Sequence, residues 1–122
     1  MPKNVETIGM FEFVNCTSLV SVVMQDGSNL KNIYDHAFQG CSNLTTVVLK
    51  EGLQRLMCAP FADCTSLTDV IIPSTLEAFG QPFSNCTSLT NISFHGVPPT
   101  DLGLWGTEGD KGYPKTVGYD RP

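Results

Sequence analysis

The amino-acid sequence predicts a solenoid, in which short coils of chain stack along one axis and their parallel strands line up into a sheet. Three observations predict this fold class. Four cysteines recur at spacings of 25, 23 and 22 residues, and each has a phenylalanine three residues before it and a leucine three residues after it. A β-branched residue and another large apolar residue follow each cysteine at six and eight residues. A unit of this size cannot bury its apolar side alone, so neighbouring units must stack into a continuous core.

The repeated positions form apolar columns that stay in register through four units. From the phenylalanine onward these are Phe13, Phe38, Phe61, Phe83; Cys16, Cys41, Cys64, Cys86; Leu19, Leu44, Leu67, Leu89; Val22, Val47, Val70, Ile92; and Met24, Leu49, Ile72, Phe94. An apolar pair precedes each of these runs: Val5 and Ile8, Leu30 and Ile33, Leu53 and Leu56, Leu76 and Phe79. Two extra residues in the turn at 25–29 and one missing residue between Phe79 and Phe83 account for the unequal spacings.

Each unit is expected to contain one strand and one corner. The stretches Leu19–Met24, Leu44–Lys50, Leu67–Ile72 and Leu89–Phe94 have a period of two near their ends, which predicts strands that stack in parallel into one sheet. The stretch from phenylalanine through cysteine to leucine must then turn the corner, with those three side chains pointing inward.

The two ends of the chain depart from the repeat. Residues 1–9 align with residues 72–80, so the first coil starts in mid-repeat, which predicts a piece of a longer solenoid or a first coil covered by a partner chain. Residues 1–95 are assigned to the repeats, and residues 96–122 to an irregular C-terminal cap or tail. In that tail we expect a cap, with Trp105 covering the final coil and a last short strand at Lys115–Tyr119.

The pattern resembles the BspA-like leucine-rich repeats. The second unit carries the resemblance most clearly, with Leu30-Lys-Asn-Ile33 followed by Ala37-Phe38-Gln-Gly-Cys41-Ser-Asn-Leu44-Thr-Thr-Val47-Val-Leu49. The resemblance covers about residues 1–95 and implies a right-handed leucine-rich-repeat solenoid of parallel stacked strands joined by short turns or 3₁₀ segments. It also implies a cell-surface or secreted protein that binds host proteins, matrix proteins or other cells. Glu12, Pro60 and Pro82 replace the alanine of the family pattern, which should reshape a turn without breaking the stack.

Composition excludes several function classes. The net charge is −5, and the seven Lys and Arg residues are scattered, so no basic face is available for nucleic acid. No apolar run is long enough to cross a bilayer, so membrane insertion is not expected. The N-terminus does not have the pattern of a signal peptide.

Cysteine and histidine suggest no chemical site. The four aligned cysteines are expected to form a ladder of small buried thiols, although neighbouring coils about 5 Å apart leave a disulfide open on distance. Cys58 lies outside the column and is expected to be partly exposed.

The spacing of Cys and His does not match a zinc site, so no metal or cofactor is expected. His36 is interpreted as a surface residue, because no nucleophile is placed beside it, and no catalytic residue is assigned. Four sequons, at Asn15, Asn43, Asn85 and Asn91, follow from the repeat consensus itself.

A binding surface is predicted on the strand face, because residues between the inward columns must point outward. They form three ladders: Ser21, Thr46, Asp69, Asn91; then Val23, Val48, Ile71, Ser93; and then Gln25, Lys50, Pro73, His95. In the central ladder three apolar residues adjoin, which is typical of an interface, although single exposed β-branched residues are also ordinary in sheets.

The leading hypothesis is a non-enzymatic module that binds a protein partner in adhesion or recognition. The alternative is a structural spacer or self-assembling segment with no specific ligand, which associates end to end through its uncapped N-terminal coil. A third reading, an enzyme with an unrecognised site, has no cluster of polar residues in its favour.

Overall fold

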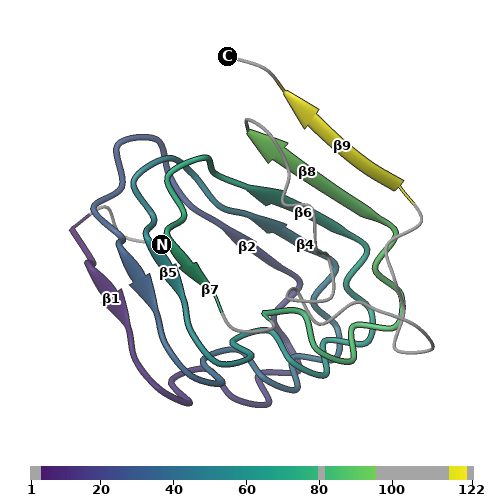
Figure 1. Cartoon of the computed structure of the whole chain (residues 1–122). Coiled ribbons are helices and arrows are strands. Elements are labelled where there is room, and N and C mark those ends of the chain that lie inside the picture. The colour runs from purple at the N-terminus through teal and green to yellow at the C-terminus, as the bar shows by residue number, and fades with distance from the viewer. Residues whose placement is uncertain (1–3, 80–81, 96–115, 121–122) are drawn as a thin grey trace.

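The computed structural model describes residues 4–79, 82–95 and 116–120, which form a solenoid of parallel strands without helices (Figure 1). It has about four coils, and we number them by their apolar columns: coil 1 is residues 5–24, coil 2 is 30–49, coil 3 is 53–72 and coil 4 is 76–94. Each coil contributes one strand to each of two sheets, and the apolar columns face the space between the sheets. The predicted solenoid is therefore confirmed.

The first sheet, sheet A, was not expected from the sequence. It consists of four strands of two residues each, in the order β1 (Thr7–Ile8), β3 (Asn32–Ile33), β5 (Arg55–Leu56) and β7 (Ala78–Phe79). These strands contain the second member of each upstream apolar pair. The sequence did not reveal them, because two-residue strands are too short to show an alternation.

The second sheet, sheet B, is the predicted one. It has the order β2 (Ser21–Val23), β4 (Thr46–Val48), β6 (Asp69–Ile72), β8 (Asn91–His95) and β9 (Thr116–Asp120). The first four strands begin two residues later than predicted. The reason is that each preceding leucine still belongs to the corner, where its N–H donates to the cysteine carbonyl three residues back, as in Leu44 to Cys41 at 3.1 Å.

Strand β9 confirms the last strand that we predicted in the tail. It runs parallel to β8, with His95 aligned to Asp120, and so extends sheet B by one strand. The predicted cap position of Trp105 lies outside the described residues. The same holds for most of the predicted tail, so the boundary at residue 95 stays a prediction.

The corner between the two sheets is built from turns with hydrogen bonds from residue i+3 to residue i. In coil 1, for example, Val14 donates to Phe11 and Cys16 donates to Phe13. Two backbone positions per corner lie in the left-handed region: one column holds Phe11, His36 and Ala59 at φ 56–58°, and the other holds Asn15, Gly40, Asp63 and Asn85 at φ 57–74°. These left-handed residues interrupt the turns, so the described residues form turns of 3₁₀ type and no continuous 3₁₀ helix.

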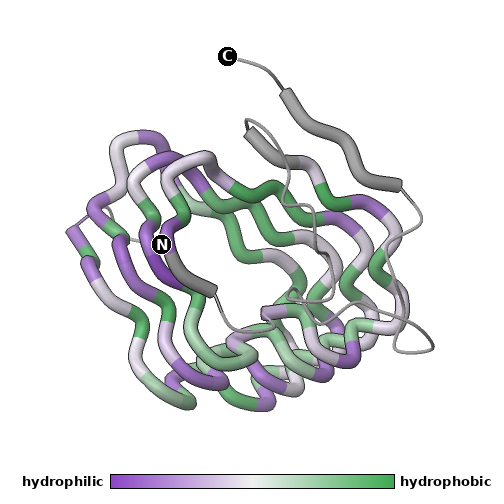
Figure 2. The backbone as a smooth tube through the Cα atoms, in the orientation of Figure 1, coloured by the Kyte–Doolittle hydropathy of each residue, from purple (hydrophilic) through white to green (hydrophobic). Residues whose placement is uncertain are grey.

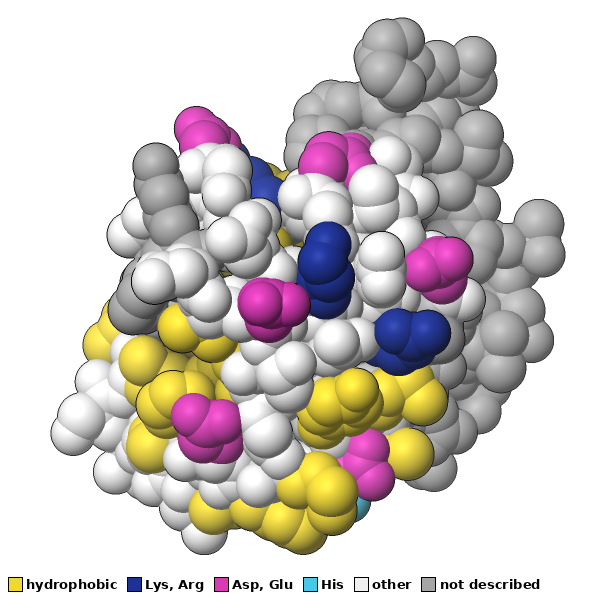
Figure 3. All heavy atoms as spheres, turned by 90° about the vertical axis from the view of Figure 1, so that its left-hand side faces the viewer, with side chains coloured by type: hydrophobic (Ala, Val, Ile, Leu, Met, Phe, Trp, Pro, Cys, Tyr) yellow, Lys and Arg dark blue, Asp and Glu magenta, His cyan; other side chains and the backbone are white. Residues whose placement is uncertain are grey.

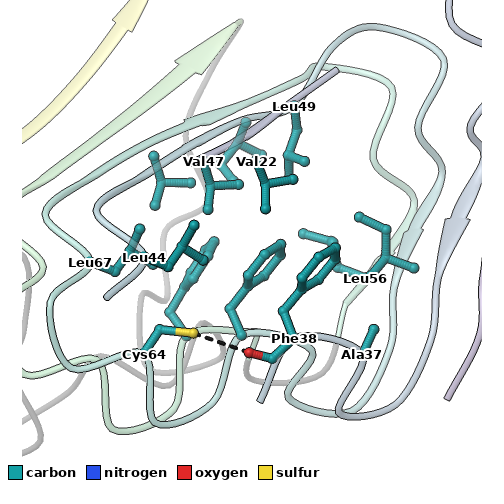
Figure 4. Packing of buried hydrophobic residues seen from close by; sticks show 14 of the residues in the cluster. Val22, Ala37, Phe38, Leu44, Val47, Leu49, Leu56, Cys64 and Leu67 are labelled. Carbon is teal, nitrogen blue, oxygen red and sulfur yellow. Dashed lines mark hydrogen bonds between the residues drawn. The ribbon is translucent and has the colours of Figure 1, made fainter. Parts of the chain in front are cut away.

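The core is a set of stacked columns, and its axis runs along the solenoid (Figure 4). The phenylalanine rings stack from coil to coil, with centroids 5.1 Å apart for Phe13–Phe38, 5.1 Å for Phe38–Phe61 and 5.8 Å for Phe61–Phe83. Leucine, valine and isoleucine from both sheets pack around this ring stack. The inward orientation predicted for phenylalanine, cysteine and leucine at the corner is confirmed.

Candidate functional site

The outer face of sheet B carries the residues that the sequence placed in a binding surface. Parallel pairing aligns Ser21 with Thr46, Asp69 and Asn91, and it aligns Val23 with Val48, Ile71 and Ser93. The two ladders therefore exist in the predicted register. Because Val22, Val47, Val70 and Ile92 between them are buried, the pleat directs both ladders outward.

The central ladder is an apolar stripe that spans three coils. Val23 is 47% exposed, and Val48 and Ile71 are partly exposed, as is Ser93 at its end. Figure 2 shows that strands β2, β4 and β6 of sheet B are more hydrophobic than strands β1, β3 and β5 of sheet A. The stripe thus combines solvent access with fixed backbone geometry, since β4 and β6 are paired on both sides.

The third ladder does not form a surface of the predicted kind. Gln25 is exposed, and Lys50 is partly exposed and forms an ion pair of 3.1 Å with Asp26. Pro73, however, is buried, because the chain has left the strand at Ile72 and turns toward the next coil. The side chain of His95 lies outside the described residues, and of the described members of this ladder Gln25 and Lys50 are accessible.

Hydrogen bonds between coils hold the polar ladder in place. The Asn91 Nδ2 donates to Asp69 Oδ1 at 2.7 Å, and the Thr68 hydroxyl donates to Asp69 Oδ2 at 2.8 Å. The hydrogen bond from Asn91, and then that from Thr68, lowers the pKa of the Asp69 carboxyl. Asp69 therefore presents a negative charge beside the apolar stripe at neutral pH.

The aligned cysteines connect one coil to the coil before it. The thiols of coils 2 to 4 donate to the carbonyl of the phenylalanine in the coil before: Cys41 to Phe13 at 3.3 Å, Cys64 to Phe38 at 3.3 Å and Cys86 to Phe61 at 3.1 Å. Figure 4 shows the bond from Cys64 to Phe38 at the edge of the ring stack. All five cysteines are free thiols; Cys41, Cys64 and Cys86 are buried, and Cys16 is partly buried.

Burial makes Cys41 and Cys86 poor nucleophiles. Desolvation raises the pKa of Cys41 to about 11, and the hydrogen bond with Cys64 together with burial raises the pKa of Cys86, whereas the same hydrogen bond lowers the pKa of Cys64. Since the thiolate is the reactive form, the thiols of Cys41 and Cys86 are structural. Cys58, which the sequence placed outside the column, is exposed as predicted.

His36 is less exposed than a surface residue. Its ring stacks on Phe11 with centroids 5.1 Å apart, and its Nδ1 atom is buried with no hydrogen-bond partner. The left-handed backbone at φ 57° turns the side chain along the corner toward coil 1. The signal available in the sequence was the repeat alignment, which places Phe11 and His36 in the same column, five residues before Cys16 and Cys41.

Two features of the corner of coil 1 were not predicted from the sequence: its exposed apolar turn and the hydrogen bond of Glu12. The turn at residues 10–14 holds exposed apolar side chains, and Glu12 within it uses its carboxylate to accept the Gly9 N–H at 2.7 Å. Glu12 stands in the column that otherwise holds Ala37, Pro60 and Pro82, and that exception was the available signal.

Within the residues that the structure describes, no group of three or more His, Cys, Asp or Glu side chains could hold a metal ion. The same residues include no helix with the length and apolar character needed to cross a membrane.

Comparison with known proteins identifies the repeat. The family model described as BspA type leucine rich repeat region matches residues 1–98 with six copies. The chain belongs to the BspA-type leucine-rich repeat family. Neither the curated proteins nor the solved structures contain a significant match to it.

The prolines that replace alanine at the corner keep the hydrogen bonds between coils. Pro60 and Pro82 have no N–H to donate, but the N–H of Ala37 in the same column donates to Tyr34 within its own turn and not to a neighbouring coil. The carbonyls of Pro60 and Pro82 still accept the N–H groups of Phe38 at 2.7 Å and Phe61 at 3.0 Å. The expectation that these departures leave the stack intact is confirmed.

BspA-type repeats are modules often used in protein interaction, and they are generally associated with surface or secreted proteins.

Proposed function

We propose that this chain is a non-enzymatic adhesion or recognition module of a surface or secreted protein, and that it contacts a protein partner through the outer face of sheet B. The observation that carries the proposal is the apolar stripe of Val23, Val48 and Ile71, aligned in register on three neighbouring coils. Apolar stripes flanked by polar residues are typical of interfaces, since the apolar centre supplies affinity and the polar rim supplies orientation.

The geometry favours side-chain contact. Strands β4 and β6 have no free edge, so a partner meets the face of the sheet rather than adding a strand to it. The flanking ladder of Ser21, Thr46, Asp69 and Asn91 supplies hydroxyl, carboxylate and amide groups. Asp69 in addition would select a partner that is basic near this edge of the stripe.

Sheet A is a weaker candidate for the partner. Its described outward residues are Thr7, Asn32 and Arg55, which are polar or charged, and Arg55 donates to Asn32 at 3.3 Å. Its strands are also two residues long and expose one outward side chain each. This face can therefore serve as a matched control.

The test is binding of the whole chain to a panel of purified extracellular-matrix proteins, measured by biolayer interferometry. Replacing Val48 and Ile71 together by Lys should abolish the binding that the wild-type chain shows, because the charges have to be desolvated in the contact. The circular dichroism spectrum should stay native, since both side chains point outward.

The control carries the same two charges on the outer face of sheet A, as Thr7→Lys with Asn32→Lys on neighbouring coils, and should bind like the wild type. Equal binding by both double variants, with both folded, would contradict the proposal. The alternative of a spacer without a ligand predicts no binding to any member of the panel.

A further inference from the structure

The turn that joins β2 to β3 is longer than the corresponding turns of the next two coils. It consists of residues 25–29, whereas the other two turns are residues 50–52 and 73–75. The turns lie along the upper rim of the molecule in Figure 1, and Figure 3 shows acidic side chains standing out from that rim. The two extra residues are Asp26 and Gly27, so the added length belongs to this turn itself and not to its place in the stack.

The tip of the longer turn makes few contacts with coil 2. In the next turn along the stack, the Gly52 N–H donates to the Thr75 hydroxyl of coil 3 at 2.9 Å. The Gly27 N–H has no hydrogen-bond partner among the described residues. The Asp26 carboxylate forms an ion pair of 3.1 Å with Lys50, and exposed ion pairs of this kind contribute little to stability. The longer turn is therefore held less firmly by its neighbour than the shorter turn is.

The space around Asp26 and Gly27 leaves their peptide bond free to rotate. The Asp26 side chain is 93% exposed, and no described atom lies within 4 Å of the position that a Cβ would take at Gly27. The turn is closed on either side of the two residues, where the Ser28 N–H donates to the Gln25 carbonyl at 3.1 Å. Since Gly27 has no side chain, its backbone nitrogen can approach the carboxyl of Asp26 without a steric clash.

An aspartate followed by an unhindered glycine can react with its own backbone. The Gly27 nitrogen bonds to the Asp26 Cγ, and the carboxyl OH leaves with the amide proton as water, which gives a five-membered succinimide. Water then opens the ring. Hydrolysis at the Cγ carbonyl restores aspartate, whereas hydrolysis at the main-chain carbonyl leaves the chain linked through Cγ, which is isoaspartate. Water is the only reagent, and the net reaction is an isomerisation.

Two other aspartates of the described chain are held in ways that oppose this reaction. After Asp35, the attacking nitrogen would be that of His36, whose N–H donates to the Cys58 carbonyl at 3.1 Å. After Asp69, it would be that of Val70, which is β-branched and lies in a strand paired on both sides. The fold therefore restrains the backbone at these two positions and leaves it free at Asp26.

We propose that Asp26–Gly27 is a modification site, at which the aspartate isomerises to isoaspartate in the folded chain. The product adds one carbon to the backbone of the turn and moves the carboxylate away from its place beside Lys50. Lys50 is an accessible member of the third ladder, so the reaction rearranges charge at the border of the outer face of sheet B. An isoaspartate at this exposed tip is also open to methylation by a protein carboxyl methyltransferase.

The test is incubation of the whole chain at neutral pH and body temperature, with samples taken over weeks. Trypsin releases residues 4–31 and 32–50 as peptides with Asp26 and Asp35 as their respective sole aspartates. Electron-transfer fragmentation distinguishes isoaspartate from aspartate in each peptide. Isoaspartate should accumulate at Asp26 and stay at its starting level at Asp35. Methyl transfer from S-adenosylmethionine by a protein isoaspartyl methyltransferase should rise in parallel.

The free peptide of residues 4–31 shows whether the fold leaves the site open. Isomerisation in the folded chain should be within about tenfold of that in the peptide, because exposed turns open at almost no cost in free energy. The matched variant is Asp26→Glu, which keeps the charge but would have to close a six-membered ring, and it should show no isomerisation at this position. Its circular dichroism should match that of the wild type. No isoaspartate at Asp26, equal accumulation at Asp35, or much stronger protection by the fold would each overturn the proposal.

Discussion

The residues with left-handed backbone at the corner differ in how well their side chains suit that conformation. Asn15, Asp63 and Asn85 are of the types that tolerate it, and Gly40 has no Cβ to resist it. The other column holds His36, which is also of a type enriched there, and Phe11 and Ala59, which lack such an advantage. Strain therefore accumulates at Phe11 and Ala59, where stacking of coils holds the backbone in place.

Ala59→Gly tests this strain. At φ 56° an alanine Cβ costs roughly 1–2 kcal/mol, and glycine removes that cost while making the unfolded chain more flexible. We expect the substitution to raise the free energy of unfolding by about 0.5–1 kcal/mol, measured by urea denaturation. Ala62→Gly is the matched control, since Ala62 is buried without a positive φ and should lose stability instead.

The buried thiols make stability depend on pH at the alkaline end. The pKa of Cys41 is about 11 in the folded chain and 9.0 without the fold, so the unfolded chain releases this proton first as the pH rises. The contribution of Cys41 is fully present below pH 9.0 and is lost between there and pH 11. We expect the urea midpoint to fall across this window, and to fall less in Cys41→Ala, which has no thiol to titrate. An identical pH dependence in the two proteins would contradict the assignment.

At the scale of the elements, sheet B could be predicted from the sequence and sheet A could not. The alternation that ends in Val22 and Met24 is long enough to be recognised, and it places the apolar stripe on the correct face. Strands such as Thr7–Ile8 exist only because neighbouring coils supply partners for them. The misplaced Pro73 has a similar cause, since its burial depends on where the chain turns in three dimensions.

The contribution of each phenylalanine ring to the free energy of unfolding depends on its position in the ring stack. Phe61 lies between Phe38 and Phe83 and is fully buried, whereas Phe13 has one ring neighbour in its column and is 37% exposed. Phe61→Leu removes two ring contacts and should cost about 2 kcal/mol of unfolding free energy, and Phe13→Leu should cost less than about 1 kcal/mol. Thermal melts of the two variants, recorded side by side, measure the difference. Equal losses would contradict the view that the energy of a ring depends on its place in the stack.

At the scale of the whole molecule, the solenoid is a one-dimensional array, in which each coil contacts the coils next to it. An internal coil buries both of its faces, whereas in coil 1 the side chains of Met10, Phe11, Phe13 and Val14 are exposed. Stability should therefore depend on the number of internal coils more than on any single contact.

A chain with one more internal coil tests this view of the molecule. A second copy of residues 42–64, inserted directly after Cys64, keeps every column in register because the spacing from Cys41 to Cys64 is one repeat of 23 residues. The added coil brings another ring for the phenylalanine stack, another thiol for the carbonyl of the preceding phenylalanine, and one more strand for each sheet. We expect a higher melting temperature, and a denaturant m-value larger by about a fifth, in proportion to the added buried surface. The same 23 residues inserted in scrambled order cannot keep these columns and should lower the melting temperature. If the ordered insert lowered it as well, the coils would not be interchangeable units, and stability would reside in contacts particular to each coil.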